Sequence, residues 1–591
     1  MTNNFFYLHF LTFISLFADP SNYDEMKQLG NKMLKHCWGL PLAVVVLGGL
    51  LSEKQTLDEW ETLHENVKEL INKGQSIDEQ HQGVLWVLGL SYDGLPYQLK
   101  PCFLHLANFP EDSEINVKEL CRIWTAEGFV LNENEAHKCL MELVYRGMVQ
   151  VGKPSSIVGR IKTCRMHDLM RDLCLEKARN ENFLSFINFQ EAEGYGVSTQ
   201  VMPTGKVRRL AVYSNENIVS ELLPLINNRD ECLRSLICFG PEQYLPNPRD
   251  LFKPLFNCCY MLRVLKFENI SELSRVLLPK EIGSLIHLRF LSLRNCGVFR
   301  LPSSMVNLRC LQTLDLRRRF ISTMVLCSMK NVIPKLDHLR HLYLPILWDE
   351  TFLDRSSVQL LLVEQFPLRL GNLKSLETLV NFDTRYCKLD DLSHLTKLIK
   401  LKIISQKGLG EIKSASNLQS LDLLADGKKP EDIVPFLASY LRIQKLKLVQ
   451  TRVSLQKNIL SPNLVKVTLR STYLEIDPMP ILGQLSKLRI LALGYHSYNG
   501  KKMVCCKDSF PQLESLSIQE LGNLEEWTVE EGALSKLCHL KIQNCPNLKS
   551  YPHGLKNITT LKEIEIIRMS EGFKTSFEQG GGDKDCHNEI E

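Results

Sequence analysis

The sequence is poor in the motifs that mark enzymes. It contains no H-E-x-x-H metalloprotease motif, no G-x-S-x-G nucleophile elbow and no kinase H-R-D set. One near match to a phosphate loop, with Gly147, Gly152 and Lys153 in "GMVQVGKP", continues with Pro154. A phosphate loop needs a Ser or Thr hydroxyl at that position to hold magnesium, and it follows a strand, whereas the local pattern here runs from helix to hairpin. We therefore predict no catalytic residues, and ATP hydrolysis at Gly152 and Lys153 is the weakest function considered.

Paired cysteines and a charge of one sign are also missing. The 19 cysteines are an odd number without any C-x-x-C pair, which favours reduced, buried thiols over a disulfide framework. The 71 basic and 67 acidic residues leave a net charge of +4, too small to argue for nucleic-acid binding by attraction to phosphate. We predict no metal site, because the two histidines of "HLRH" (338–341) fall in a repeat strand and are expected at the surface.

No apolar run reaches the roughly twenty residues that span a bilayer. The leader, residues 1–20, is apolar from Phe5 to Phe17, but no Lys or Arg precedes this run as a signal peptide requires. We interpret it as a truncated or mis-predicted start. The segment "LPLAVVVLGGLL" (40–51) is too short to span and predicts a buried helix. We expect a cytoplasmic protein and leave open a peripheral association with the plasma membrane.

Two small domains are predicted first. Residues 21–84 are predicted to be a helical domain, in which Ser21 and Asp24 give a capping signal and Pro41 fits the first turn of a second helix. Residues 85–190 begin with short amphipathic helices. A helix running into a strand follows at 138–152, and then a turn, a strand and a helix start, which together predict a winged-helix domain. Apolar residues of the first helix recur at helical spacing: Met26, Leu29, Met33, Leu34 and Cys37.

Beyond residue 200 a leucine-rich repeat dominates the chain. Thirteen L-x-x-L-x-L units start between residues 262 and 561, about 25 residues apart, inside the range of leucine-rich repeats. Two degenerate units open the series at 207 and 233, and the longer interval after 339 predicts either a loop or an atypical repeat at 347–360. The fold class is thus multidomain, with an α-helical bundle and a winged helix followed by an α/β leucine-rich-repeat solenoid (horseshoe) at 200–575. The polar residues 576–591 are predicted to be a disordered tail. The thirteen units start at 262, 288, 311, 339, 376, 398, 418, 443, 464, 488, 513, 537 and 561.

The repeat predicts a docking surface. Each unit places a short strand on the inner face of the horseshoe, with its leucines stacked between neighbouring repeats. The two residues that flank the fourth position should therefore point into the concave solvent face. These include Thr313, Asp315, His341, Tyr343, Lys400, Lys402, Lys445, Lys447, His539 and Lys541.

Four segments carry a family resemblance. "CWGLPLAVVVLGGLL" (37–51) resembles the GLPLA motif of plant nucleotide-binding leucine-rich-repeat immune receptors, which are disease resistance proteins. "CFLHLANFPEDSEI" (102–115) and "LCRIWTAEGFV" (120–130) resemble segments of their coiled-coil subclass. "RMHDLMRDL" (165–173) is similar to their MHD motif, and the repeats follow in the expected order.

The resemblance implies a switch governed by ADP and ATP. It places Pro41 against the nucleotide base and gives His167 a hydrogen bond to the terminal phosphate of ADP, while Asp168 orients the turn or caps the next helix. Partners implied by the family are a pathogen effector or a guarded host protein on the concave face, and self-association of the intact receptor. This sequence departs from the family because about forty residues, with neither phosphate loop nor coiled coil, precede GLPLA. We therefore expect weak or absent nucleotide binding. A packed interdomain role for His167, and a repeat scaffold without switching, remain as alternatives.

Overall fold

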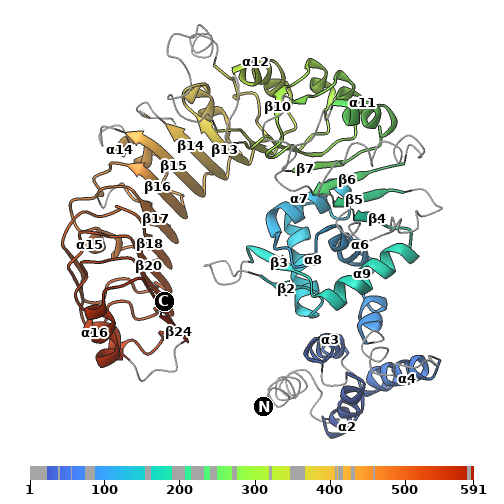
Figure 1. Cartoon of the computed structure of the whole chain (residues 1–591), viewed down its shortest axis with the longest axis horizontal. Coiled ribbons are helices and arrows are strands. Elements are labelled where there is room, and N and C mark those ends of the chain that lie inside the picture. Colours follow the sequence, from blue (N-terminus) through green and yellow to red (C-terminus); the bar gives the residue numbers. More distant parts are fainter. Residues whose placement is uncertain are drawn as a thin grey trace, which may run out of the picture. The chain divides into compact units, whose positions relative to one another are not determined.

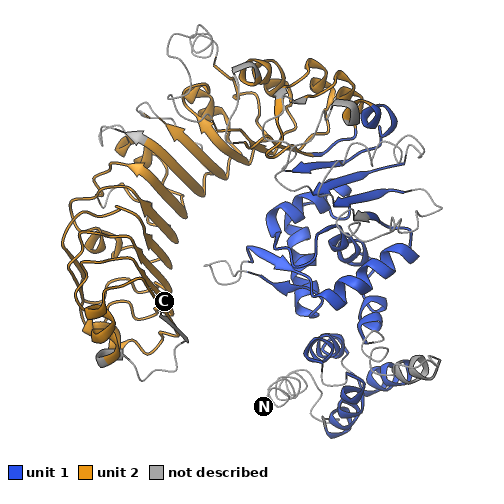
Figure 2. Ribbon diagram, in the orientation of Figure 1, with its two compact units in different colours: residues 1–245, 254–268, 287–290 blue, residues 246–253, 269–286, 291–591 orange. Residues whose placement is uncertain are grey.

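The computed structural model divides the chain into two compact units (Figure 2). Unit 1 comprises residues 1–245, 254–268 and 287–290, and unit 2 comprises the rest. The leader, residues Lys153 and Pro154, and the loop expected at 347–360 lie outside the described residues. The structure describes residues 23–37, 40–54, 56–73, 87–152, 161–188, 207–213, 232–239, 249–268, 276–318, 323–346, 367–405, 409, 417–427, 433–456, 459–581 and 587–590.

Unit 1 starts with helices. Its elements are α2 (Tyr23–Leu34), the 3-10 turn η1 (Lys35–Cys37), α3 (Pro41–Leu51) and α4 (Leu57–Lys73). The residues of α2 at helical spacing, Met26, Leu29 and Met33, are buried, and α2 packs against α4. Because α3 is apolar all round, it is buried along most of its length, as the sequence predicts for residues 40–51.

The predicted winged-helix arrangement is present. Its elements are α6 (Lys100–His105), η2 (Leu106–Asn108), β1 (Ile115–Asn116), α7 (Val117–Glu127), α8 (Glu133–Tyr145), β2 (Gln150–Val151), β3 (Thr163–Arg165) and α9 (Asp168–Asn180). The three strands form an antiparallel sheet in the order β1-β3-β2. Side-chain caps fix two helix starts: Asn116 accepts from the N–H of Glu119, and Asn132 accepts from two N–H groups of α8. Gly128, with φ of 84°, ends α7 in a left-handed conformation that favours glycine.

The repeat sheet begins inside unit 1. Strands β4 (Ser185–Asn188), β5 (Arg209–Tyr213), β6 (Ser235–Phe239) and β7 (Val264–Glu268) pair in parallel and in order (Figure 1). The two degenerate units at 207 and 233 supply β5 and β6. Strand β4 lies in the range assigned to the winged helix from the sequence, 85–190, yet it belongs to the repeat sheet. Its "SFIN" sequence carries no repeated leucine that would have predicted this.

Unit 2 continues the repeats as a parallel sheet. Each of the fifteen sequence repeats, the thirteen regular ones and the two degenerate ones, supplies a strand that starts at its third residue. The leucine at the fourth position is buried between neighbouring repeats, as Leu401, Leu446 and Leu491 illustrate. Within unit 2 these strands line the inner side of a curved array (Figure 2). The strands are β9 (Phe290–Ser292), which begins in unit 1, β11 (Thr313–Asp315), β12 (His341–Tyr343), β13 (Thr378–Asp383), β14 (Lys400–Ser405), β15 (Ser420–Gly427), β16 (Lys445–Thr451), β17 (Lys466–Arg470), β18 (Ile490–Leu493), β20 (Ser515–Gln519), β22 (His539–Gln543) and β23 (Glu563–Ile567).

Short elements complete the outer side of each repeat. Two small parallel pairs, β8 (Val276–Leu277) with β10 (Val298–Arg300) and β19 (Lys502–Cys505) with β21 (Glu526–Val529), lie beside the main sheet. Helices and 3-10 turns close the remaining repeats. They are α11 (Arg249–Cys258), α12 (Thr323–Val332), α14 (Val434–Ala438), α15 (Met479–Leu482), η3 (Lys280–Ser284), η4 (Ser303–Asn307), η5 (Ile333–Lys335), η6 (Leu389–His394) and η8 (His553–Asn557).

The prediction of a disordered tail at 576–591 is wrong for much of that segment. Helix α16 extends over Glu571–Gly581, and β24 (His587–Ile590) pairs in parallel with β23. Phe573 and Phe577 lie one helical turn apart, and both are buried against Tyr551. The polar and glycine-rich composition concealed this aromatic pair, which gives the segment an apolar face.

The described cysteines are all free thiols, and most of them are buried. Among the described helices, none is both long enough and apolar enough to cross a bilayer.

Candidate functional site

His167 forms the N-cap of α9. Its Nδ1 accepts a hydrogen bond of 3.4 Å from the N–H of Leu169, and its ring is half-buried beside the buried Met166. Asp168, to which the sequence analysis assigned a turn-orienting or capping role, is the exposed first residue of α9. Because Nδ1 is an acceptor, a neutral ring carries its proton on Nε2. The imidazole therefore keeps one N–H donor that the cap does not use.

Pro41 is the exposed first residue of α3. No side chain caps this helix, so the amide groups of its first turn rely on other acceptors. Pro41 and His167 belong to the same compact unit, but among the described residues no hydrogen bond or ring contact joins them. The structure thus places the two predicted residues at two separate helix starts.

The near match to a phosphate loop has another structural role. Gly147, with φ of 70°, follows α8, and the N–H of Met148 bonds to the carbonyl of Leu143 in a helix C-terminal motif. Gly152 donates to the carbonyl of Thr163 on β3, where an added Cβ would lie 2.6 Å from Oγ1 of Thr163. These glycines close a helix and pair a hairpin, as the helix-to-hairpin pattern indicates.

The sequence analysis missed a buried junction between the winged helix and the opening repeats. Arg209 of β5 pairs with Glu127 at the end of α7, with 3.0 Å between Nε and Oε2. The Arg209 guanidinium also lies 4.1 Å from the ring centroid of Phe183 and 4.9 Å from that of Phe129. Burial lowers the pKa of Arg209, and Glu127 opposes this shift by stabilising the charged form. Arg263 adds a 2.7 Å hydrogen bond to the carbonyl of Glu127.

A second buried cation lies on β7 of the same junction. Lys266 bonds to Glu119 of α7 and lies 3.3 Å from the carboxylate of Glu268. Burial alone would lower the pKa of Lys266, but these two carboxylates outweigh it and raise the pKa. Tyr213 of β5 completes the contact, because its hydroxyl donates to the carbonyl of Asn108 at 2.6 Å.

One sequence signal could have revealed this junction. Four of the eight outward positions in the opening repeats are apolar and join the core of the winged helix: Ala211, Ile237, Val264 and Phe290. In a solvent-facing row these positions should be polar, as most of them are in later repeats. The outward face of β5–β7 is therefore packed against the winged-helix part of unit 1.

The ten residues predicted to face solvent divide into two groups. Thr313, Asp315, His341 and Tyr343 are buried, contrary to prediction. Part of the cause is Arg317, which pairs with Asp315 and lies 4.5 Å from the ring centroid of Tyr343. The other six are exposed or half-buried, as predicted: Lys400, Lys402, Lys445, Lys447, His539 and Lys541.

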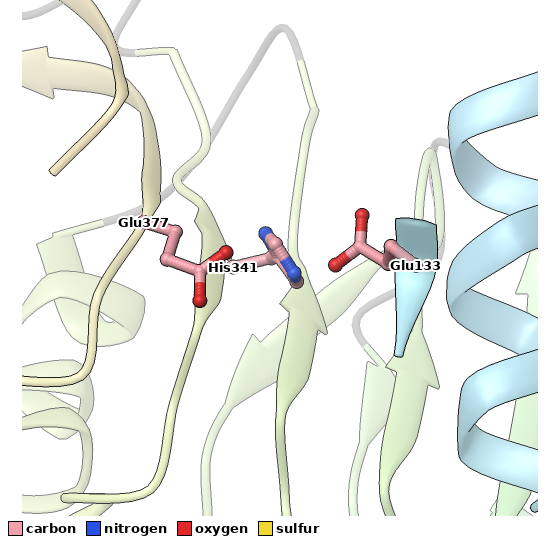
Figure 3. A group of neighbouring side chains, drawn as sticks. All are labelled: Glu133, His341 and Glu377. Atoms are coloured by element: carbon pink, nitrogen blue, oxygen red, sulfur yellow. The ribbon is translucent and has the colours of Figure 1, made fainter. Parts of the chain in front are cut away.

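One of the two "HLRH" histidines also differs from the prediction. His338 is exposed, but His341 is only 3% exposed on β12, where Thr313 and Thr378 flank it in register. Figure 3 shows His341 with Glu377, the residue that precedes β13, and Arg340 engages the Glu377 carboxylate at 2.9 Å. Glu133, labelled in the same view, begins α8 and belongs to the other unit.

Comparison with known proteins identifies both parts of the chain. Residues 232–579 match the leucine-rich repeat region family, and residues 109–174 match the disease resistance protein winged helix domain. The disease resistance RPP8-like protein 2 of Arabidopsis thaliana is 35% identical over 590 residues, covering 96% of this chain and 62% of its own length. Disease resistance protein RPP8 of the same plant is 35% identical over 582 residues, covering 95% and 60%. The chain thus spans about 60% of the length of these relatives.

Solved structures add little. The crystal structure of a TLR13–ssRNA13 complex aligns with 61% of this chain and 57% of its own at 20% identity, with a TM-score of 0.32. An alignment this loose carries no functional conclusion. Since the model of the leucine-rich repeat region matches more than half of the chain, the chain belongs to that family, and its residues 109–174 match the winged helix domain of disease resistance proteins.

Proposed function

We propose that this chain acts in plant innate immunity as a receptor that senses a pathogen effector or a guarded host protein. The observation that carries the proposal is the 35% identity with disease resistance proteins along nearly the whole chain, from the helices through the last repeat. The winged helix packs on the opening repeats through buried ion pairs, which supports a mechanical link between recognition and the helical part.

Recognition is assigned to the later repeat strands. The strands β5–β7 pack against the winged-helix core, whereas β14–β17 keep exposed or half-buried polar side chains on their outward rows. Solenoid repeats present such rows as an extended binding surface. A protein partner is the natural occupant of a surface of this kind.

We also propose that His167 contributes to a nucleotide-dependent contact. Its Nε2–H donor is not used by the helix cap, and the uncapped start of α3 behind Pro41 adds backbone N–H donors. Both features fit a nucleoside diphosphate, which would supply phosphate oxygens as acceptors to His167 and a base to lie against Pro41. We expect the affinity of this chain alone for the nucleotide to be weak.

Loss of the gene tests the immune role. Plants lacking it should become susceptible to at least one pathogen strain from a panel that the parent plant resists, and the wild-type gene should restore resistance. Unchanged resistance across the panel would contradict the proposal.

Calorimetry with ADP separates the switch from a repeat scaffold without switching. His167→Ser keeps a capping oxygen for α9 but removes the imidazole, whereas His167→Ala removes both. Weak ADP binding to the wild type that both variants abolish supports the nucleotide contact. Equal binding by all three proteins, or none by the wild type, favours the scaffold.

A further inference from the structure

Four neighbouring strands of unit 2 carry a concentration of positive charge on their outward rows. Five lysines and a single aspartate occupy these rows on β14–β17: Lys400, Lys402, Asp422, Lys445, Lys447 and Lys466. We call these six residues the lysine face. One row runs in register from Lys400 through Ser420 and Lys445 to Lys466, and the other from Lys402 through Asp422 to Lys447 and Thr468.

The alternation of each strand fixes the direction of these side chains. On β14, Leu401 and Ile403 are buried in the solenoid, so Lys400 and Lys402 point to the opposite face. The same alternation holds on β16 and β17, where Lys447 is exposed. Neighbouring strands lie about 4.8 Å apart, so the lysine face is a dense array of cations on a rigid sheet.

A pocket opens where β16 and β17 end. Its volume is about 370 Å³, within the range of ligand pockets. Val453, Leu455 and Ile481 contribute apolar wall, while Arg452 and Tyr473 lie at its edge. Ile476 also lines it and is 73% exposed, so an apolar side chain of a ligand can reach it.

The edge of this pocket is held in place. The ring of Tyr473 stacks on the ring of His496, with 5.8 Å between their centroids. The Arg452 guanidinium lies 5.8 Å from the centroid of the Tyr473 ring. The backbone of Tyr473 is left-handed, with φ of 50°, and its N–H bonds to the carbonyl of His496. A surface fixed in this way loses little conformational freedom when a ligand binds.

We propose that the lysine face and this pocket together dock an extended, acidic segment of a partner protein that carries one apolar anchor residue. Carboxylates of the segment lie along the lysines, and the anchor fills the space between Val453, Leu455 and Ile476. The inference rests on the proposed function, because it names the chemistry of the partner that the repeats recognise.

Two observations favour a protein segment over nucleic acid. Asp422 stands between Lys402 and Lys447 in its row, where it repels a phosphate backbone but accepts a peptide N–H. Glu475 and Asp477 also line the pocket, and both Asp477 oxygens accept backbone N–H groups, from Met479 and Val504. A continuous polyanion would meet these carboxylates, whereas a peptide can place neutral residues there.

The test uses fluorescence anisotropy with a labelled synthetic peptide rich in glutamate that contains one leucine. Matched probes replace all glutamates by glutamine, or the leucine by serine, and a poly-dT oligonucleotide serves as the nucleic-acid probe. We expect the first peptide to bind the full chain at least about tenfold more tightly than either matched peptide or the oligonucleotide. Tighter binding of the oligonucleotide, or equal binding of the leucine and serine peptides, overturns the proposal.

Variants locate the binding. The double variant Lys402→Glu, Lys447→Glu and the pocket variant Ile476→Ser should each weaken the peptide by about tenfold, with unchanged far-UV circular dichroism. Lys536→Glu, an exposed charge reversal away from the lysine face, should leave binding unchanged. Equal losses in all three variants would contradict a specific site. If the protein binds the peptide but plants without its gene stay resistant, the immune role is refuted and the peptide-binding surface stands. If the gene is needed for resistance but the protein does not bind the peptide, the surface is refuted and the immune role stands.

Discussion

Glu127 and Arg209 form an ion pair that is almost completely withdrawn from water. Their side chains are 0% and 8% exposed, and 3.0 Å separates Arg209 Nε from Glu127 Oε2. Glu127 ends α7 of the winged helix, and Arg209 begins the repeat strand β5. The pair therefore joins the winged helix to the repeats at one point.

Breaking this pair should be costly. Arg209→Met leaves the Glu127 carboxylate buried without its cation, and we expect a loss of about 3–5 kcal/mol in the free energy of unfolding. The double variant Glu127→Leu, Arg209→Met removes both charges and should lose less than Arg209→Met alone. Urea unfolding of the three proteins measures this. Lys501→Met, which breaks the exposed Lys501–Glu525 pair, is the control and should unfold like the wild type. An Arg209→Met protein as stable as the wild type would contradict the structure.

His105 should make the stability of unit 1 depend on pH. The ring is fully buried, and neither nitrogen has a hydrogen-bond partner among the described residues. Burial, with a smaller contribution from Arg209, lowers the pKa of His105 to about 3, so the folded ring stays neutral while the unfolded ring gains a proton below about 6.5. Stability should thus be complete above pH 6.5 and fall as the pH decreases towards 3, by about 2 kcal/mol at pH 5. In His105→Leu, the free energy of unfolding should depend less on pH between pH 7 and 5. An unchanged dependence would contradict the assignment to His105.

Two helical glycines offer a matched comparison. A Cβ at Gly49 would lie 2.7 Å from the backbone of Arg146, whereas one at Gly89 would meet nothing within 4 Å. Gly49→Ala should therefore force α3 away from the end of α8 and cost about 1–3 kcal/mol. Gly89→Ala should be neutral or stabilise by up to about 1 kcal/mol, because alanine favours the helix at 87–93. Thermal unfolding with opposite shifts for the two variants is the expected result, and shifts of the same sign would be inconsistent with this packing.

Helix α16 should stabilise the last repeats. Phe577→Ala removes a buried ring that lies 5.0 Å from Tyr551, measured between centroids, and should cost about 3–5 kcal/mol. Glu571→Ala, an exposed change in the same helix, should have little effect. Hydrogen exchange at β23 reports the loss locally, since terminal repeats act as caps. Protection of β23 that is unaffected by Phe577→Ala would show that α16 is dispensable.

Much of the fold could be predicted because the same repeat pattern recurs many times in the sequence. Every repeat keeps an aliphatic residue at its first and fourth positions, so its third residue marks the start of a strand even where the other positions vary. The winged helix followed from the change of helical to alternating spacing near residue 150. The strand β4 and helix α16 could not be predicted in this way, because one lacks leucines and the other depends on two phenylalanines within a polar segment.

Less of the candidate site could be predicted from the sequence. His167 could be singled out only by resemblance, and its cap to Leu169 depends on the backbone conformation of the turn. The Glu127–Arg209 and Lys266–Glu119 contacts join residues 82 and 147 positions apart, which no local pattern links. The outward rows show the same limit: Thr313 and Lys400 occupy equivalent places in their units, yet one is buried and the other half-buried.

The packing of the winged-helix core against β5–β7 constrains the opening strands of the solenoid more than the later ones. A substitution at Ala211 or Ile237 must fit a packed interior, so only small changes of volume are tolerated there. At Lys402 or Lys447 almost any polar residue leaves the coil intact. The later strands are thus free to acquire new specificities by single substitutions, while the opening strands must keep their shape.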